Sequence, residues 1–436
     1  MKSRRQTVLH EIGFRVVLCA SALALALAAS SASAGQGLYS ITDLGTLGGS
    51  QSAAYGINNA GQAVGSADVT TTSPISKHAF LYTNGVMTDL GVLGTYTSVQ
   101  GTVSVSEADG INSTGQIVGF SYNSSGAIHA FLYDQGQMND LGVLAIAQQS
   151  KADFINDSGQ IVGWSVPAGP QHAFLYDGAN MNDLGTLGGT ASFAYGINNS
   201  GQIVGDSWTN TSALSDIAFI YSNGVMTALG SLGNLPAIQA LAINDSGQIA
   251  GYAGGVDTGG PTVKHGFLYS GGTMTDLGNL GGYYTNVVPS AINNSGQIVG
   301  GISGYQTAAH AFLYSGGTMS DLNNLVDPGS GWTLTRATGI NNNGQIVGIG
   351  TNPSFRSHGF LLTPRPALRN LRLSGGQAQF DLSGMTGVTY RVEYALSLPT
   401  TNWLVLTNLS MSASPVQIMD TTNTRTGERF YRAVQP

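Results

Sequence analysis

A nine-residue phrase that recurs along the chain limits its fold more than any other feature. The phrase reads INNSGQIVG at residues 197–205, and related copies begin at Ile57, Ile111, Ile155, Ile243, Ile292 and Ile340. The successive starts are 54, 44, 42, 46, 49 and 48 residues apart, which indicates a repeat architecture. Each copy places Asn and Gly between two short apolar runs, and this pattern predicts a β-hairpin.

A second recurrent phrase lies between the copies of the first. It reads HAFLY, a turn with Gly, and then M-x-D-L-G, at residues 78–91, 129–142, 172–185 and 265–278 and in weaker form at 310–323. Two hairpins supply four strands, which is the content of one β-propeller blade. Seven repeats therefore predict an all-β, seven-bladed β-propeller.

The two ends of the repeat region predict how such a ring closes. Residues 39–45 resemble a fourth strand without its blade, and residues 358–362 resemble a third strand without its neighbour. Pairing the two segments would leave no open sheet edge, so we expect a propeller closed by the N-terminal strand. A linear solenoid with an unpaired strand at each end is the alternative.

Residues 1–34 have the features of a secretory signal peptide. A basic start is followed by an uncharged apolar run over residues 16–29 and by Ala32-Ser33-Ala34 before the expected cleavage site. A retained anchor helix is the alternative, but the run is short for a membrane span. We expect a secreted, periplasmic or cell-surface protein without disulfides, because the only cysteine, Cys19, lies in the removed segment.

The rest of the chain divides into three parts. Residues 35–362 form the predicted propeller, residues 363–366 (Thr-Pro-Arg-Pro) a stiff linker, and residues 367–436 a small β-sandwich.

Residues 35–364 contain five Lys and Arg against eighteen Asp and Glu, a net charge of −13, whereas residues 365–436 contain seven against four, or +3. An acidic body argues against nucleic-acid or anionic-membrane binding. We expect a monomer with no cofactor and no membrane span after signal cleavage.

Three phrases in fixed order, IN..GQIVG, HAFLY and DLGTLGG, resemble the bacterial extracellular HAF-repeat family over residues 39–362. This resemblance implies export and the repeat architecture, but no activity. The tail, with residues 390–393 (Tyr-Arg-Val-Glu), Trp403 and residues 430–432 (Phe-Tyr-Arg), looks like small C-terminal β-modules of some secreted bacterial proteins.

Histidines occupy one place in the repeat, the first residue of HAFLY. An Asp follows eleven residues later in five repeats, and both residues are lost together in the remaining full repeat, as Ile217 and Ala228. Across a hairpin this separation brings the two side chains together on adjacent strands, so we expect structural hydrogen bonds rather than a metal or catalytic site. The expected pairs are His78 with Asp89, His129 with Asp140, His172 with Asp183, His265 with Asp276, His310 with Asp321, and His358 with Asp43 of the closing strand.

Calcium binding at the hairpin turns is less consistent with the sequence. Residues 156–159 and 244–247 read Asn-Asp-Ser-Gly, but residues 198–201 have no carboxylate, and hard cations need several charged oxygen ligands. We therefore expect no metal.

An enzyme, such as a polysaccharide hydrolase or lyase, would need carboxylates that depart from the repeat. The chain has Asp68, Glu107, Asp109, Asp153, Asp206, Asp216, Asp257 and Asp327 in such places.

Binding is better supported than catalysis. The links between hairpins vary in length while the turns within hairpins stay nearly constant, which is typical of a scaffold that presents loops on one face. Aromatic side chains that depart from the repeat follow the second strand or lie in these links, and they suit a glycan or peptide ligand. We expect a non-enzymatic binding or surface-interaction module, with these candidate ligand contacts: Phe120, Tyr122, Trp164, Trp208, Tyr252, Tyr305 and Trp332.

Overall fold

A computed structural model describes most of the chain after the expected signal segment. The described residues are 14–16, 37–69, 75–98, 101–144, 148–166, 169–209, 216–256, 262–282, 284–304, 307–374, 377–384, 389–397, 402–411, 416–422 and 429–434. The predicted signal peptide therefore lies outside the described residues except for 14–16, and Asp257 and Tyr305 lie outside them too. The chain has two compact units, residues 41–325 with 330–363, and the C-terminal residues 364–436 with 1–40 and 326–329.

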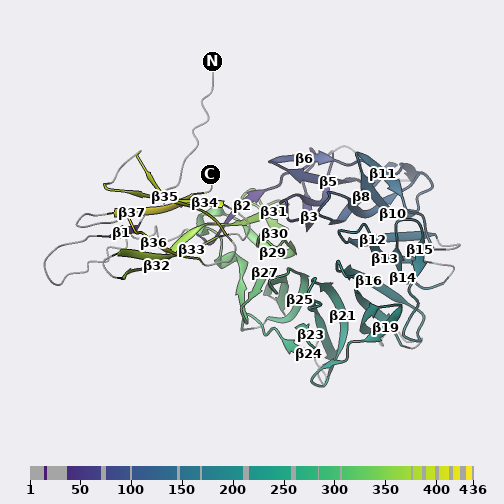
Figure 1. Ribbon diagram of the computed structural model, residues 1–436. Coiled ribbons are helices and arrows are strands. Elements are labelled where there is room, and N and C mark those ends of the chain that lie inside the picture. The colour runs from purple at the N-terminus through teal and green to yellow at the C-terminus, as the bar shows by residue number, and fades with distance from the viewer. Residues whose placement is uncertain are drawn as a thin grey trace, which may run out of the picture. The chain divides into compact units, whose positions relative to one another are not determined.

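Each repeat of the larger unit folds into four consecutive antiparallel strands (Figure 1). Repeats 1 to 4 contain β3 (Ser52–Ile57), β4 (Ala63–Asp68), β5 (Ile75–Thr83) and β6 (Val86–Asp89); β8 (Gly101–Ile111), β9 (Ile117–Tyr122), β10 (Ile128–Asp134) and β11 (Gln137–Asp140); β12 (Gln149–Ile155), β13 (Ile161–Val166), β14 (His172–Tyr176) and β15 (Met181–Asp183); and β16 (Ser192–Ile197), β17 (Ile203–Trp208), β18 (Asp216–Ser222) and β19 (Val225–Ala228).

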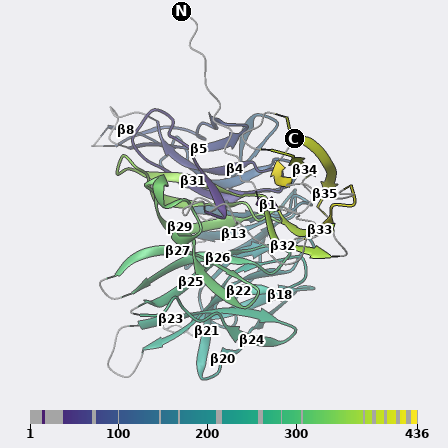
Figure 2. The same cartoon turned by 90° about the vertical axis from the view of Figure 1, so that its left-hand side faces the viewer.

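Repeats 5 to 7 have the same order, and the last takes its fourth strand from the start of the chain. They contain β21 (Leu235–Ile243), β22 (Ile249–Val256), β23 (Thr262–Ser270) and β24 (Thr273–Asp276); β25 (Tyr284–Ile292), β26 (Ile298–Gly304), β27 (Thr307–Ser315) and β28 (Thr318–Asp321); and β29 (Thr333–Ile340), β30 (Ile346–Thr351), β31 (Ser357–Pro364) and β2 (Tyr39–Asp43). This is the architecture of a β-propeller. Figure 2 shows the strands of repeats 5 and 6 side by side.

Further strand pairing joins some repeats and extends others. β5 pairs in parallel with β8, and β23 with β25, so that two pairs of repeats share a continuous sheet. The long insertion before Gly110 forms a hairpin, in which β7 (Tyr96–Ser98) pairs with the first half of β8. β20 (Ser231–Leu232) pairs with β21 in the same way, and two 3-10 turns, η1 (Leu322–Asn324) and η2 (Pro328–Ser330), precede repeat 7.

The hydrophobic core lies between neighbouring repeats. The phenylalanine of each HAFLY-type strand is fully buried: Phe80, Phe131, Phe174, Phe219, Phe267, Phe312 and Phe360. One core cluster combines Val162 and Ala173 of repeat 3 with Ile203 and Phe219 of repeat 4. Because a repeat buries its apolar face only against the next one, the repeats stabilise each other. The glycine after each second-strand valine permits this packing, since a Cβ on Gly205 would collide with the Phe193 carbonyl oxygen and approach the Phe219 ring.

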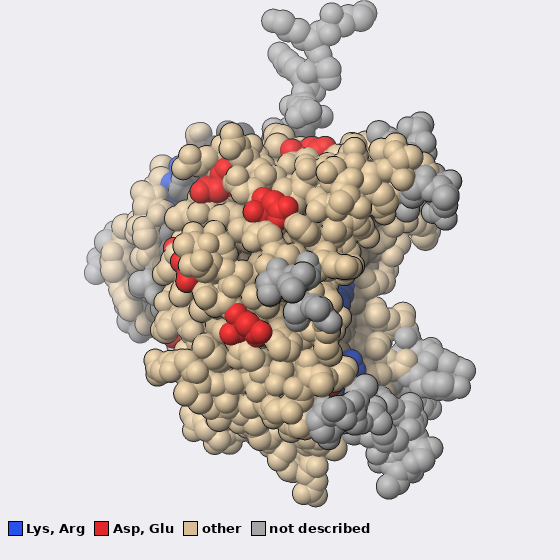
Figure 3. Space-filling view, turned by 90° about the vertical axis from the view of Figure 1, so that its right-hand side faces the viewer, with Lys and Arg blue, Asp and Glu red and all other residues tan. Residues whose placement is uncertain are grey.

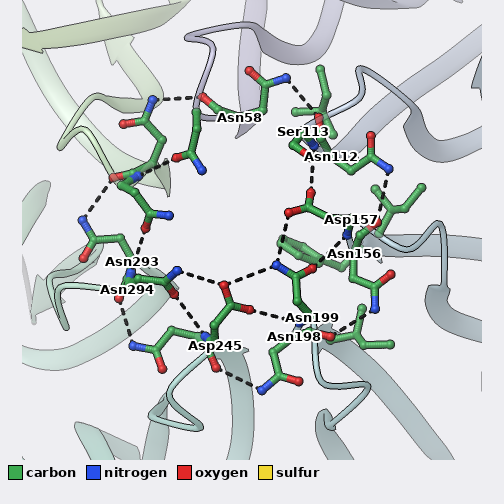
Figure 4. Close-up of a pocket in the computed structure, with 18 of the residues that line it drawn as sticks. Asn58, Asn112, Ser113, Asn156, Asp157, Asn198, Asn199, Asp245, Asn293 and Asn294 are labelled. Carbon is green, nitrogen blue, oxygen red and sulfur yellow. Dashed lines mark hydrogen bonds between the residues drawn. The ribbon is translucent and has the colours of Figure 1, made fainter. Parts of the chain in front are cut away.

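Seven asparagines form a cycle of hydrogen bonds at the turn after each first strand (Figure 4). The Nδ2 of each donates to the backbone oxygen of the next at 2.9–3.2 Å, in the order Asn58, Asn112, Asn156, Asn198, Asn244, Asn293, Asn341 and back to Asn58. Each Oδ1 also accepts backbone N–H groups of its own turn, such as those of Ser200 and Gln202 for Asn198. The first strands are therefore the innermost strands, and we call them the inner strands.

The C-terminal unit has two small sheets that share one core. β32 (Ala367–Ser374), β33 (Gln377–Ser383) and β36 (Val416–Met419) form one sheet, and β34 (Thr389–Ala395), β35 (Leu404–Ser410), β37 (Arg429–Val434) and β1 (Phe14–Val16) form the other. Phe380 from the first sheet and Tyr390 and Tyr431 from the second pack together, as in a β-sandwich. The predicted linker begins too early, because Thr363 and Pro364 still belong to β31. Within the described part of the chain, no helix is long and apolar enough to cross a membrane.

The asparagine cycle generates a stability prediction. Asn198→Ala removes the side-chain bonds to the buried Asn244 oxygen and to the Gln202 side chain, and it removes the acceptor of the Ser200 and Gln202 backbone N–H groups. We expect a loss of about 1–3 kcal/mol in the free energy of unfolding, measured by chemical denaturation. Ser200→Ala, on the exposed side of the same turn, is the matched control. Equal stability of the two variants would contradict a stabilising role for the cycle.

Candidate functional site

Each repeat has three variable positions, two on the inner strand and one on the second strand. The entrance position, five residues before the cycle asparagine, is Ala53, Glu107, Lys151, Phe193, Gln239, Val288 or Arg336. The bulge position, three residues before it, is Tyr55, Asp109, Asp153, Tyr195, Leu241, Ser290 or Thr338. The second-strand position, directly after the glycine of the second strand, is Ser66, Phe120, Trp164, Asp206, Tyr252, Gly301 or Ile349. We call these three sets together the inner-strand cluster.

A fixed residue separates the two variable positions of each inner strand. Between the entrance and bulge positions the chain has alanine in six repeats and proline in one: Ala54, Ala108, Ala152, Ala194, Ala240, Pro289 and Ala337. These alanines are fully buried. The repeat therefore requires one small residue for packing, while the residues on either side are free to differ in charge, size and polarity.

A β-bulge occurs at the same place in all seven repeats. The register between the first and second strands shifts across Tyr55, Asp109, Asp153, Tyr195, Leu241, Ser290 and Thr338. A bulge leaves one residue out of the ladder and redirects its side chain, and bulges are frequent beside functional sites. The bulge places these side chains against the neighbouring repeat.

The contacts between these positions follow a regular rule. The entrance side chain of one repeat contacts the bulge side chain of the preceding repeat, as in Lys151 Nζ to Asp109 Oδ1 at 3.0 Å and Gln239 Nε2 to the Tyr195 hydroxyl at 3.2 Å. It also contacts the second-strand residue of that preceding repeat, as in Gln239 Nε2 to Asp206 Oδ1 at 3.0 Å. Such contacts connect neighbouring repeats within the inner-strand cluster.

Repeats 1 to 3 contribute an ionic part of the cluster. The Lys151 ammonium lies 3.0 Å from Asp109 Oδ1 and 3.2 Å from Asp153 Oδ1, and it lies 5.6 Å from the centroid of the Phe120 ring. Burial raises the pKa of both Asp109 and Asp153, although the ammonium opposes the shift. Burial alone would lower the pKa of Lys151, but the carboxylates, Asp109 first, raise it overall. The lysine thus compensates carboxylates that are costly to bury alone.

Repeats 3 to 5 contribute an aromatic and amide part. The Phe193 and Tyr195 rings are nearly parallel, with centroids 6.4 Å apart, and Trp164 meets the Phe193 ring edge-on at 6.4 Å. Asp206 is only 2% exposed, and burial raises the pKa of its carboxyl to about 7 against the opposing hydrogen bond from Tyr195. Flat rings beside amide, hydroxyl and carboxyl groups are suited to polar ligands with an apolar face.

Some of the aromatic residues proposed from the sequence belong to the inner-strand cluster, and others lie outside it. Phe120, Trp164 and Tyr252 share the second-strand position and belong to the cluster. Tyr122 instead lies against Tyr96 with ring centroids 5.5 Å apart, and Trp332 packs edge-on against the buried Phe360 ring. Trp208 lies at the end of β17, outside the three positions.

The carboxylates proposed from the sequence likewise lie partly inside and partly outside the cluster. Glu107, Asp109, Asp153 and Asp206 belong to the cluster, whereas Asp68 accepts hydrogen bonds from Gln51 and Ser50, and Asp327 accepts one from Gly329. Sequence reasoning overlooked Tyr55, Lys151, Phe193, Tyr195, Gln239 and Arg336. Alignment of the seven repeats on the cycle asparagine would have revealed them as variable columns on both sides of a constant alanine.

The six expected His–Asp pairs lie within hydrogen-bond distance. The Nδ1 to carboxylate distances are between 2.6 and 3.0 Å, including 2.8 Å from His358 to Asp43. The second oxygen of the pair's Asp often accepts the N–H two residues later, as from Gly185 to Asp183 at 2.8 Å, and Gly185 has a φ of +74°. This geometry explains the D-L-G phrase as a local turn.

The cycle asparagines line a polar pocket of ≈ 150 Å³ (Figure 4). Its rim includes Asp157 and Asp245, whose carboxylates accept the backbone N–H groups of Ser113 and Asn199 at 2.9 and 3.0 Å. These carboxylates connect neighbouring turns. In the described part of the chain, no three His, Cys, Asp or Glu side chains gather as a metal site would require.

Asp206 generates a pH prediction. Between about pH 4 and 7 its carboxyl is protonated in the folded chain but ionised in the unfolded chain, because burial raises the folded pKa to about 7. The free energy of unfolding should therefore fall by a few kcal/mol as pH rises through this window. Asp206→Asn keeps the shape and the acceptor, and denaturation from pH 4 to 8 should show a weaker pH dependence. Identical pH profiles would contradict the buried neutral carboxyl.

No protein-family model matches the chain, and no curated protein matches it. Among solved structures, it is similar to a TolB protein of Agrobacterium tumefaciens (12% identity, 64% of this chain, 95% of that chain, TM-score 0.40). It is also similar to the β-propeller domain of the Trilobed protease of Pyrococcus furiosus (11%, 72% and 94%, TM-score 0.46). A third similar structure is the Aleuria aurantia lectin in complex with Fucalpha1-6GlcNAc (14%, 70% and 94%, TM-score 0.33). These scores are too low to transfer a ligand or an activity.

Proposed function

We propose that the protein is an exported, non-enzymatic binding module that holds a glycan or peptide at the inner-strand cluster. The carrying observation is the contrast within each inner strand, where one buried residue, alanine in six repeats and proline in one, separates positions that differ in charge, size and polarity. Packing alone would favour repetition at all three places, as it does at the alanine. The family resemblance and the signal-like N-terminus support export.

We further propose that the seven repeats form a ring of seven blades closed by β2. Two contacts between repeats 7 and 1 support this arrangement because they recur between other neighbours. Asn341 Nδ2 donates to the Asn58 oxygen at 2.9 Å, and the Gly359 N–H donates to Ser52 Oγ at 3.0 Å. Equivalent bonds join repeats 3 and 4, from Asn156 to Asn198 and from Ala173 to Ser192.

Deletion of residues 35–45 tests the closed ring. It removes β2 and leaves the β31 edge unpaired, so we expect a large fall in melting temperature or aggregation of the mature protein. His358→Ala is the control, since it removes the pair with Asp43 and keeps the strand, at an expected cost of about 1 kcal/mol. A deletion variant as stable as the parent would exclude closure by this strand.

Two tryptophan substitutions test the binding site. Glycan and peptide arrays would first identify ligands of the mature protein. Trp164→Ala should then weaken binding by about 1–3 kcal/mol, because the ring lies in the cluster, whereas Trp208→Ala should have little effect. Calorimetric titration measures affinity, and thermal melting of both variants separates binding from stability.

Two outcomes would contradict the proposal. If Trp164→Ala lowers the melting temperature sharply and leaves ligand affinity intact, the ring serves the core instead of a ligand. If the protein cleaves a polysaccharide and Asp109→Asn or Asp153→Asn abolishes cleavage, the alternative of a secreted hydrolase or lyase is correct.

A further inference from the structure

Basic residues are rare in the larger unit, and four of the five belong to the inner-strand cluster or contact it. Residues 35–364 contain only Lys77, Lys151, Lys264, Arg336 and Arg356. Lys77 and Lys151 have carboxylate partners in the ionic part of the cluster, at 3.9 Å from Glu107 and 3.0 Å from Asp109. Lys264 and Arg336 form no ion pair with any carboxylate in the part of the chain that the structure describes. The carboxylates of the ionic part thus have lysine partners, whereas Lys264 and Arg336 have no carboxylate partner among the described residues.

The two uncompensated cations are held in place by neutral groups. The Lys264 ammonium lies 4.2 Å from the centroid of the Tyr252 ring, and the Lys264 backbone N–H donates to Asn286 Oδ1 at 3.1 Å. Arg336 Nε and Nη2 each lie 3.3 Å from Ser290 Oγ. Arg336 occupies an entrance position, Ser290 a bulge position and Tyr252 a second-strand position, so this group is part of the inner-strand cluster.

The charges of the two side chains act on each other. Burial and the nearby Arg336 charge lower the pKa of Lys264. The surrounding protein also lowers the pKa of Arg336, whose side chain is still accessible to solvent. Two like charges that are partly removed from water destabilise each other unless an anion lies between or beside them. An arginine beside a lysine is also a suitable receptor for a carboxylate, which the guanidinium binds through two parallel hydrogen bonds.

The surrounding chemistry favours an acidic sugar over other anions. Gln239, Tyr195 and the parallel Phe193 and Tyr195 rings lie in the neighbouring repeats, and such groups suit sugar hydroxyls and the apolar face of a pyranose. Residues 35–364 carry a net charge of −13, and carboxylates are scattered over the face in Figure 3, which disfavours a long polyanion. A single carboxylate can still bind where the local charge is positive.

We propose that Lys264 and Arg336 form a subsite for the carboxylate of one acidic sugar, such as a terminal uronic acid, in the ligand of the inner-strand cluster. This inference rests on the proposed binding function and specifies its ligand. Ser290 orients the guanidinium, and Tyr252 holds the ammonium over its ring. The aromatic and amide part of the cluster then contacts the sugar hydroxyls and ring faces.

The test compares matched oligosaccharides on the mature protein by calorimetric titration. The probes are galactose oligomers of the same length with and without a terminal galacturonic acid. We expect at least tenfold tighter binding of the acidic oligomer at low salt, and loss of most of this preference in Lys264→Gln and Arg336→Gln. Both substitutions should lower affinity for the acidic oligomer by a larger factor than affinity for the neutral oligomer. Arg356→Gln, which removes a cation outside the cluster, should preserve the preference.

The possible results separate this inference from the proposed function. Equal binding of acidic and neutral oligomers would overturn the subsite and leave glycan binding intact. Competition by inorganic phosphate or sulfate as strong as that by free galacturonate would overturn the choice of a sugar carboxylate. Arg336-dependent binding of peptides through a free C-terminal carboxylate, without binding of either oligomer, would overturn the acidic glycan and support a peptide ligand. Binding of no glycan and no peptide would overturn both proposals.

Discussion

The asparagine cycle is the interaction on which the larger unit depends. Each side chain bonds the next turn through Nδ2 and holds its own turn through Oδ1, so one short residue satisfies backbone groups of two repeats. All seven are at least 95% buried, where an unsatisfied polar group is costly. No single repeat can complete this network, just as none can bury its phenylalanine alone. The repeats therefore depend on one another for both hydrogen bonds and apolar burial.

The cycle asparagine is the same in all seven repeats, whereas the residues three and five positions before it differ. Alanine at the middle position permits close packing between strands, and the bulge after it directs the next side chain toward the neighbouring repeat. Residues as different as Tyr55, Asp109, Leu241 and Ser290 occupy the same bulge. The scaffold thus tolerates chemical diversity at these positions, because neither ladder hydrogen bonds nor the core depends on them.

The buried charges show that this diversity has an energetic cost. A chain with only 9% charged residues places Glu107, Asp109, Lys151 and Asp153 together, although burial raises the pKa of both aspartates. Replacement of a buried ionic group by apolar residues is often neutral or stabilising. This energetic cost supports the proposal that the cluster recognises a ligand. The uncompensated Lys264 and Arg336 extend the same argument.

The sequence alone determined the β class, the repeat and five of the His–Asp pairs, because each depends on local spacing along the chain. The sixth pair, His358 with Asp43, followed instead from the two incomplete ends of the repeat region. It also identified Phe120, Trp164, Tyr252 and several cluster carboxylates as departures from the repeat. It did not separate these from Tyr122 and Trp332, nor did it reveal Lys151, Gln239 and Arg336. Only the tertiary structure decided which side chains meet, because most contacts in the cluster join different strands, many of them in different repeats. The direction of the bulged side chain and the burial that shifts the Asp206 pKa both arise from packing against a neighbour that local sequence does not specify.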